Sequence, residues 1–119
     1  MERVGFIIHQ WRQILLLDFS HCSADEAINI IDGAKEVIRS QPHSSILILT
    51  DVTGAKYDLK VIEKFKEFTS GNKPYVKASA VVGLDEFQKV VYNAATLFSK
   101  RNLPLFDDIE KAKDWLIGQ

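Results

Sequence analysis

One short segment combines residue types that could build a polar binding site. Asp51, Thr53 and Gly54 follow the aliphatic run 46–49, with Thr50 between them and the run. A glycine turn close to a helix start can offer backbone amides and the positive end of the helix dipole to a phosphate. The same residues also serve as ordinary turn formers, in which Asp and Thr side chains bond the local backbone. The sequence leaves both interpretations open.

A second polar segment follows the apolar run 14–17 and contains Asp18, Ser20 and Cys22. His21 stands beside Cys22 and suggests a thiol with its base. A catalytic pair of this kind is usually distant in sequence and close in space, whereas neighbours on an extended segment point to opposite sides. We therefore interpret Cys22 as a small, partly buried residue ahead of a helix. Asp18, Ser20 and Cys22 remain secondary site candidates.

The sequence shows no pattern for a metal or a cofactor. Cys22 is the only cysteine, which excludes an intrachain disulfide and a Cys-rich metal site. His9, His21 and His43 fall in separate loops without a partner at helical spacing. No glycine-rich phosphate loop of the Walker or dinucleotide kind is present. These observations favour a non-catalytic protein over a small enzyme built on the two candidate segments.

The overall composition narrows the class of protein further. The chain has 119 residues, of which 46% are hydrophobic and 26% charged, and its net charge is −1. A balance so close to neutral does not favour nucleic-acid binding, which needs a clustered basic excess. The longest apolar stretches are far shorter than the roughly 20 residues that cross a bilayer, and no signal peptide is evident at the N-terminus. We expect a cytoplasmic protein without membrane insertion.

Hydrophobic periodicity predicts an α/β domain with the element order β-β-α-β-α-β-α-β-α over residues 1–119. Ser23 and Glu26 have capping-box spacing, and Asp58 can cap the next helix. Alternating strands and helices imply right-handed crossovers and a mostly parallel sheet, with the first strand as an antiparallel edge. The strands are expected at 4–8, 14–17, 46–49, 76–82 and 103–106. The helices are expected from the capping box to residue 38, from Asp58 to residue 68, from near Asp85 to residue 98, and from a cap at Asp107 or Asp108 to residue 116.

This order predicts where a ligand would bind. In open α/β sheets ligands usually lie beyond the carboxyl ends of the parallel strands, where both candidate segments belong. Phe65 and Phe68 are spaced as core residues of a helix, whereas Trp11, close to the first hairpin, is a candidate for a partner surface. An exposed edge strand also favours pairing between two copies of the chain.

Three segments resemble a known family: 47–54, 72–78 and 105–116. They are similar to the small bacterial and archaeal STAS/SEC14-domain proteins, which share their fold with the SpoIIAA anti-sigma-factor antagonist. The resemblance covers nearly the whole chain and implies a single STAS-like domain with a right-handed β/α superhelix. It also implies a regulatory module.

The chain departs from that family at the phosphorylation motif. STAS antagonists carry a phosphorylatable serine in an Asp-Ser-Ser/Thr-Gly motif at the start of the second helix, where this chain has Tyr57, Asp58 and Leu59. Thr53 lies slightly earlier and is only an approximate substitute. The leading expectation is a non-catalytic regulatory module that binds another protein. The alternative is a sensor or carrier of a small apolar or anionic ligand at the strand ends.

Overall fold

The computed structural model describes residues 3–85, 88–89, 92–93 and 103–119. Its strands are β1 (Val4–His9), β2 (Arg12–Asp18), β3 (Ile46–Asp51), β4 (Val76–Val82) and β5 (Leu105–Phe106). Its helices are α1 (Ala24–Arg39), α2 (Leu59–Asn72) and α4 (Ile109–Ile117), with a 3₁₀ turn η1 (Lys73–Tyr75) before β4. Most of the predicted third helix, from near Asp85 to residue 98, lies outside the residues that the structure describes. The last strand is shorter than the predicted 103–106.

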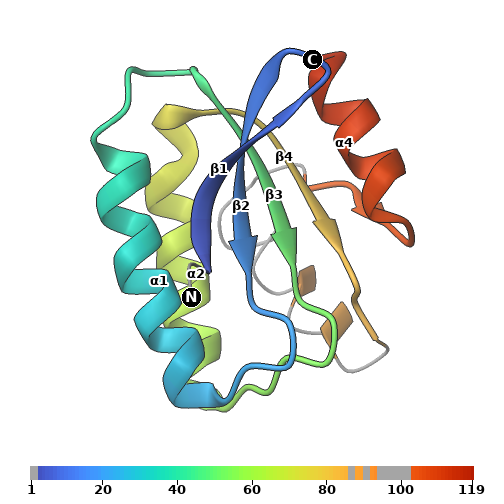
Figure 1. The fold of residues 1–119 in the computed structure, drawn as a ribbon. Helices are drawn as coiled ribbons and strands as arrows, with labels where there is room; N and C mark the ends of the chain where they lie inside the picture. Colours follow the sequence, from blue (N-terminus) through green and yellow to red (C-terminus); the bar gives the residue numbers. More distant parts are fainter. Residues whose placement is uncertain (1–2, 86–87, 90–91, 94–102) are drawn as a thin grey trace.

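The strands form one sheet in the order β1-β2-β3-β4-β5, and Figure 1 shows helices on both of its faces. β1 pairs antiparallel with β2, and the remaining pairs are parallel. α1 and α2 pack on one face and α4 on the other. Successive strands that lie side by side, joined by helices on one face, are what right-handed crossovers produce. The predicted α/β fold with an antiparallel edge is confirmed.

β3 occupies the middle of the sheet and is buried from Ile46 to Thr50. Ile46 and Ile48 join the core beneath α1 and α2, whereas Leu47 and Leu49 join the core beneath α4. A strand covered on both faces needs a continuous aliphatic run, because alternating polar residues would be buried without partners. The sequence of β3 follows from its position.

Local signals position the helices as predicted. Ser23 Oγ accepts from the N–H of Glu26 at 3.1 Å, and the Glu26 carboxylate accepts from the N–H of Ser23 at 2.9 Å. This is the complete capping box at the start of α1. Asp58 caps α2 through the N–H of Val61 at 2.9 Å, and Asp108 caps α4. Within the described residues, no helix is long and apolar enough to cross a bilayer.

Removing a side chain from the central strand should cost much of the stability. Leu49 is 0% exposed, and we expect Leu49→Ala to lower the free energy of unfolding by about 2–5 kcal/mol. Leu59→Ala is the matched control, because Leu59 is 81% exposed, and it should change stability by no more than about 0.5 kcal/mol. Urea denaturation followed by circular dichroism measures both. Similar losses in the two variants would contradict the burial of β3.

Candidate functional site

Parallel pairing brings the two polar segments of the sequence together. Asp18 at the end of β2 lies opposite Asp51 at the end of β3, and Asp51 lies opposite Val82 of β4. Val82 in turn faces Phe106 of β5, so four strand ends stand in one row. The backbone continues this alignment into the loops, where the N–H of Phe19 donates to the carbonyl of Asp51 at 2.8 Å.

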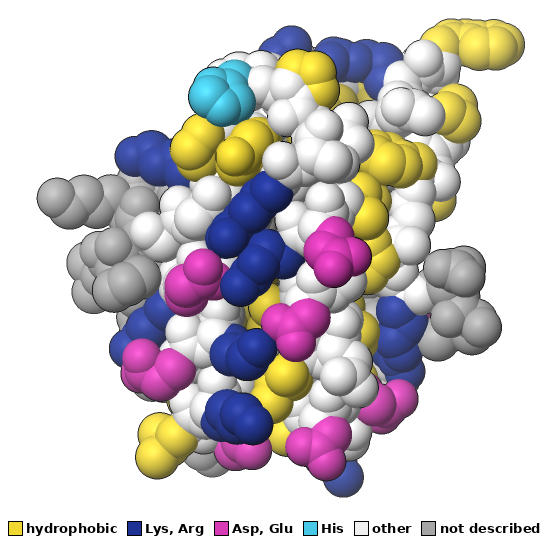
Figure 2. All heavy atoms as spheres, turned by 90° about the vertical axis from the view of Figure 1, so that its left-hand side faces the viewer, with side chains coloured by type: hydrophobic (Ala, Val, Ile, Leu, Met, Phe, Trp, Pro, Cys, Tyr) yellow, Lys and Arg dark blue, Asp and Glu magenta, His cyan; other side chains and the backbone are white. Residues whose placement is uncertain are grey.

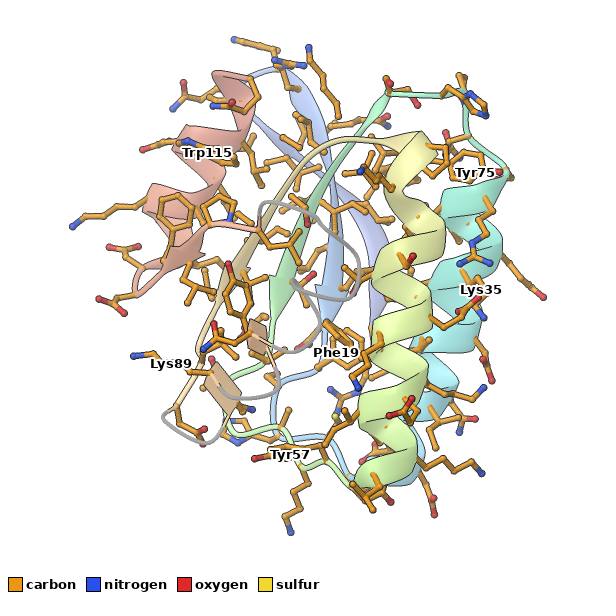
Figure 3. All side chains as sticks on the ribbon, turned by 180° about the vertical axis from the view of Figure 1, so that it is seen from behind. Phe19, Lys35, Tyr57, Tyr75, Lys89 and Trp115 are labelled. Atoms are coloured by element: carbon orange, nitrogen blue, oxygen red, sulfur yellow. The ribbon has the colours of Figure 1, made fainter. Side chains whose placement is uncertain are left out.

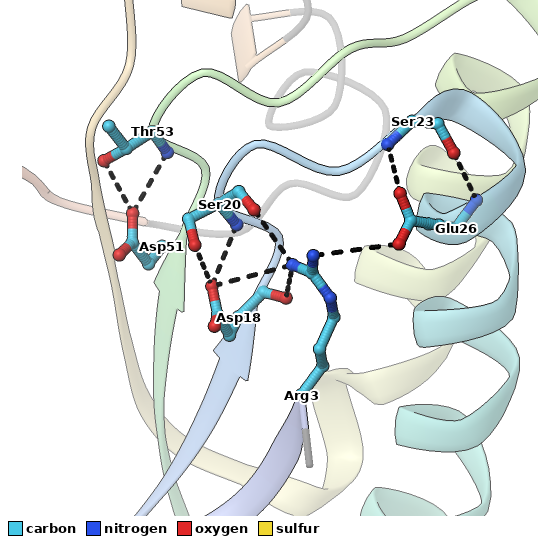
Figure 4. Close-up of polar contacts among 7 residues, drawn as sticks. All are labelled: Arg3, Asp18, Ser20, Ser23, Glu26, Asp51 and Thr53. Atoms are coloured by element: carbon cyan, nitrogen blue, oxygen red, sulfur yellow. Dashed lines mark hydrogen bonds and ion pairs between the residues drawn. The ribbon is translucent and has the colours of Figure 1, made fainter. Parts of the chain in front are cut away.

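The two segments form the same kind of turn, as Figure 4 shows. Oδ1 of Asp18 accepts from the N–H of Ser20 at 2.9 Å and from its hydroxyl at 2.5 Å. Oδ1 of Asp51 accepts from the N–H of Thr53 at 3.0 Å and from its hydroxyl at 2.7 Å. These side chains therefore bond the local backbone, which is the turn-forming role open to them from the sequence.

Arg3 fastens the first of these turns to the start of α1. Its guanidinium donates to the carbonyls of Asp18 and Ser20 at 3.1 and 2.9 Å, and it lies 3.8 Å from the carboxylate of Glu26. Hydrogen bonds from Ser23, above all from its backbone N–H, lower the pKa of Glu26, and the charge of Arg3 acts in the same direction. The charged groups here stabilise the loop.

Glycines allow the loops to pack closely. Gly54 has φ +64°, and a Cβ atom there would lie 2.4 Å from Nδ1 of His21. Gly83 has φ +86°, and a Cβ atom there would lie 2.2 Å from Oγ1 of Thr53. The N–H of His21 also donates to the carbonyl of Thr53 at 2.8 Å. Gly54 is thus favoured by its backbone conformation, and a larger residue there would have to displace the exposed ring of His21.

Two candidates of the sequence analysis are buried. Cys22 is 0% exposed, so the expectation of a partly buried residue is wrong. Burial raises the pKa of its thiol above the usual value, which is the opposite of the shift that activates a nucleophile. Thr50 is also buried, on the α2 side of the sheet. Thr53 is exposed and Asp51 is half-buried, so the accessible part of the loop is short.

An apolar cavity of about 70 Å³ lies on the α2 side of this row of strand ends. Figure 3 shows Phe19 beside α2, with Tyr57 towards the same end of the molecule. Most of the wall consists of aliphatic and aromatic side chains from α1, α2, β4 and the loops after β2, β3 and β4. The described lining residues are Phe19, Ala27, Val52, Ala55, Lys56, Tyr57, Val61, Phe65, Val81, Leu84, Gln88 and Tyr92.

The polar atoms of Gln88 and Tyr92 in this wall are directed to backbone groups. Nε2 of Gln88 donates to the carbonyls of Val52 and Ala55 at 2.8 and 3.1 Å, and its Oε1 accepts from the N–H of Asp85 at 3.0 Å. The hydroxyl of Tyr92 donates to the carbonyl of Leu103, and burial raises the pKa of Tyr92. Gln88 thereby holds the loop after β3 in place as one wall of the cavity. Most of the surface that remains for a ligand is apolar.

A second, smaller cavity of about 20 Å³ shares Phe65 and Val81 with the first. Its wall is more polar because four of its residues are polar and buried. They are Thr50, Thr69, Asn72 and Ser79. The space between α2 and the sheet therefore changes from apolar near the strand ends to partly polar further in.

The sequence predicts a core position for Phe65 but carries no helical or strand pattern that singles out Phe19, Gln88 or Tyr92. One signal was available for Phe19 and Val52, since each stands between the two polar residues of a turn. Side chains alternate across a strand, so the apolar residue must point away from the Asp that precedes it. The cavity wall begins with these two residues.

Comparisons with known proteins support the architecture. A scan of protein-family models and a search of curated proteins found no match. A solved structure does match: an uncharacterised protein of the DUF3478 family with a SpoIIAA-like fold, from Shewanella loihica PV-4. The match covers 95% of this chain and 91% of that chain, with a TM-score of 0.73 and 18% identity. The chain has a SpoIIAA-like fold. At this identity the likeness concerns the fold alone.

The close approach of Thr53 and the positive φ of Gly83 make this glycine sensitive to substitution. Gly83→Ala should lower the free energy of unfolding by at least about 1 kcal/mol, because a side chain disfavours positive φ and would collide with Thr53. Gly33→Ala is the control, since open space surrounds Gly33 in α1, and it should stabilise by about 0.5–1 kcal/mol. Thermal unfolding compares the two. A harmless Gly83→Ala would contradict the loop geometry.

The thiol of Cys22 should be unreactive in the folded protein. Because burial raises its pKa, less thiolate is present near pH 8 than in an exposed cysteine, and the side chain is inaccessible. We expect a disulfide reagent to modify Cys22 slowly in buffer and quickly in denaturant, which absorbance measures directly. Modification in buffer at the rate of a free thiol would contradict this placement.

Proposed function

We propose that this protein is a non-catalytic binding module that holds a small apolar molecule at the carboxyl ends of its strands. The observation that carries the proposal is the apolar cavity between Phe19, Val52 and Phe65. Ligands of open α/β sheets usually occupy this end of the sheet. Between the two functions expected from the sequence, the cavity favours the sensor or carrier of a ligand.

The size and chemistry of the cavity define the ligand class. A buried water needs two to four polar partners, and a wall of mostly carbon atoms provides few of them. An apolar molecule would gain contacts with Phe19, Phe65 and Val61 that water cannot make. At about 70 Å³ the cavity suits a molecule or chain end of a few carbon atoms rather than a complete membrane lipid. Lys56 is exposed at its rim and could face an anionic end group.

The polar candidates support binding rather than catalysis. Asp18 and Asp51 each accept two hydrogen bonds within their own turns, and the thiol of Cys22 is buried. A general base or nucleophile has to reach a substrate with an available lone pair. Cys22 lacks this access, and the turns already use Oδ1 of both aspartates. A reducing cytoplasm suits the free thiol of Cys22.

A regulatory role can follow from the same site. Val52 and Ala55 line the cavity, and between them lie Thr53 and Gly54, which are exposed. A ligand that displaces Val52 and Ala55 would therefore also move Thr53 and Gly54 at the surface. Another protein that contacts Thr53 and Gly54 would then distinguish the loaded from the empty module. In this way the ligand site and the expected protein partner are parts of one proposal.

Filling the cavity tests the ligand site. Ala55→Leu adds carbon atoms at the cavity wall and should abolish retention of a small apolar molecule by protein purified from its own cells. Ala24→Leu is the matched control, because Ala24 packs against the same core without lining the cavity. Organic extraction followed by mass spectrometry compares the wild type with both variants.

Two outcomes of this experiment would count against the proposal. One is equal recovery of a molecule from the wild type and Ala55→Leu, which would place the ligand elsewhere. The other is no molecule from the wild type together with unchanged unfolding temperatures when small alcohols or aromatic compounds are added, since a bound ligand stabilises the folded state. As a control, circular dichroism tests whether the Ala55→Leu variant is folded.

A further inference from the structure

β1 is an edge strand without the usual protection against pairing. Within the part of the chain that the structure describes, β1 pairs with one strand, β2. The backbone N–H and C=O groups on the other edge of β1 have no partner strand there. Natural edge strands are commonly protected by charged side chains, by proline or by a bulge. Between Val4 and His9 there is no Asp, Glu, Lys, Arg or Pro, and the register with β2 is regular.

The same strand carries exposed apolar side chains on one side. Val4 packs in the core beneath α1, whereas Ile7 packs in the core beneath α4. Because side chains alternate, Phe6 and Ile8 share the α1 side with Val4. They are 43% and 65% exposed. Figure 2 shows hydrophobic side chains gathered in a strip beside the charged face of α1, on the side where β1 lies.

The hairpin that ends β1 adds a third exposed group. His9 pairs with Arg12, so Gln10 and Trp11 alone form the turn, with φ of 45° and 73°. Turns of this kind favour Asn and Gly, because other residues are strained at positive φ. Trp11 is nevertheless 97% exposed. A strained turn that presents a tryptophan to solvent is typical of a contact surface, where tryptophan is enriched.

We propose that β1 pairs antiparallel with β1 of a second copy, which joins two five-stranded sheets into one. A two-fold axis normal to the sheet keeps the α1 sides of both copies together and makes the two edge strands antiparallel. If the axis passes through Ile7, Phe6 of each copy stands opposite Ile8 of the other. These are cross-strand pairs of apolar side chains on the same side.

Charge and space favour a second copy over an unrelated partner. The paired strands would bring no like charges together, because Val4 to His9 contains no Asp, Glu, Lys or Arg. Gly5 stands opposite His9 in this register, and a Cβ atom at Gly5 would have open space around it, which leaves room on that face for the His9 side chain of the other copy. Each Trp11 would stand beside the start of the other copy's β1. The edge is thus complementary to itself, as a two-fold interface requires.

A charge on the edge strand tests the pairing. Ile8→Lys places a lysine, the commonest protection of natural edges, on the α1 side of β1 and should weaken dimerisation by at least about tenfold. Leu59→Lys is the matched control, because Leu59 is 81% exposed on α2, and it should leave the dimer intact. Sedimentation equilibrium from low to high micromolar concentration measures the association. Phe6→Thr, which retains strand propensity, serves as a second variant if Ile8→Lys is poorly folded.

Hydrogen exchange distinguishes strand pairing from other contacts. In the wild type, amides of β1 should gain protection as the concentration rises, and in Ile8→Lys they should not. A wild type that stays monomeric at high micromolar concentration overturns the proposal. So does a dimer that persists in both Ile8→Lys and Phe6→Thr, or one whose β1 amides stay unprotected. Binding of an extended foreign peptide by a monomeric wild type would assign the edge to another partner.

Discussion

The parallel register of β3 between β2 and β4 is the constraint on which the rest of the structure depends. β3 is covered on both faces, which requires the aliphatic run from Ile46 to Leu49, and its two neighbours end at the same level as β3. Asp18 and Asp51 therefore stand side by side at one edge of the sheet. Each aspartate stabilises the turn that follows it by accepting a hydrogen bond from the backbone two residues later.

The two sides of this edge differ in chemistry because strands alternate. The polar residues of each turn satisfy one another locally, and Gly54 and Gly83 allow the neighbouring loops to close around them. The middle residue of each turn is apolar. This residue, Phe19 in one turn and Val52 in the other, points to the α2 side and joins the cavity wall. A binding site of apolar character thus forms behind a surface of polar side chains. For this reason we expect a ligand to bind more tightly in the apolar cavity than at the polar residues Asp51 and Thr53.

Much of the fold was predictable because its signals are local. The capping box of Ser23 and Glu26 and the cap of Asp58 depend on residues three positions apart, and both are present. The aliphatic run of β3 likewise predicts that this strand is covered on both faces. The length of β5 was less predictable, since Leu103 and Pro104 continue the apolar pattern although the strand begins only at Leu105, and of these two residues Pro104 contributes its carbonyl to the pairing with Val81.

The candidate site was predictable in location but not in character. The strand ends and the proximity of Asp18 to Asp51 follow from topology. The burial of Cys22 does not, because it depends on the left-handed backbone of His21, which turns the chain inwards at an ordinary polar residue. The cavity depends on the distances between side chains from strands, helices and loops. Gln88 is more than thirty positions from the two carbonyls that it binds, and no local pattern reports such a contact.

The apolar cavity is tested most directly by titrating the protein with small apolar molecules and following its methyl groups by NMR. If the cavity binds them, the methyl groups of Val52, Ala55 and Val61 will shift in a saturable way. The methyl groups of Ala112 and Leu116, beneath α4 on the opposite face of the sheet, will change little. Binding confined to these methyl groups would establish the cavity as a ligand site. Shifts that are absent, that do not saturate, or that are spread equally over both faces would contradict it.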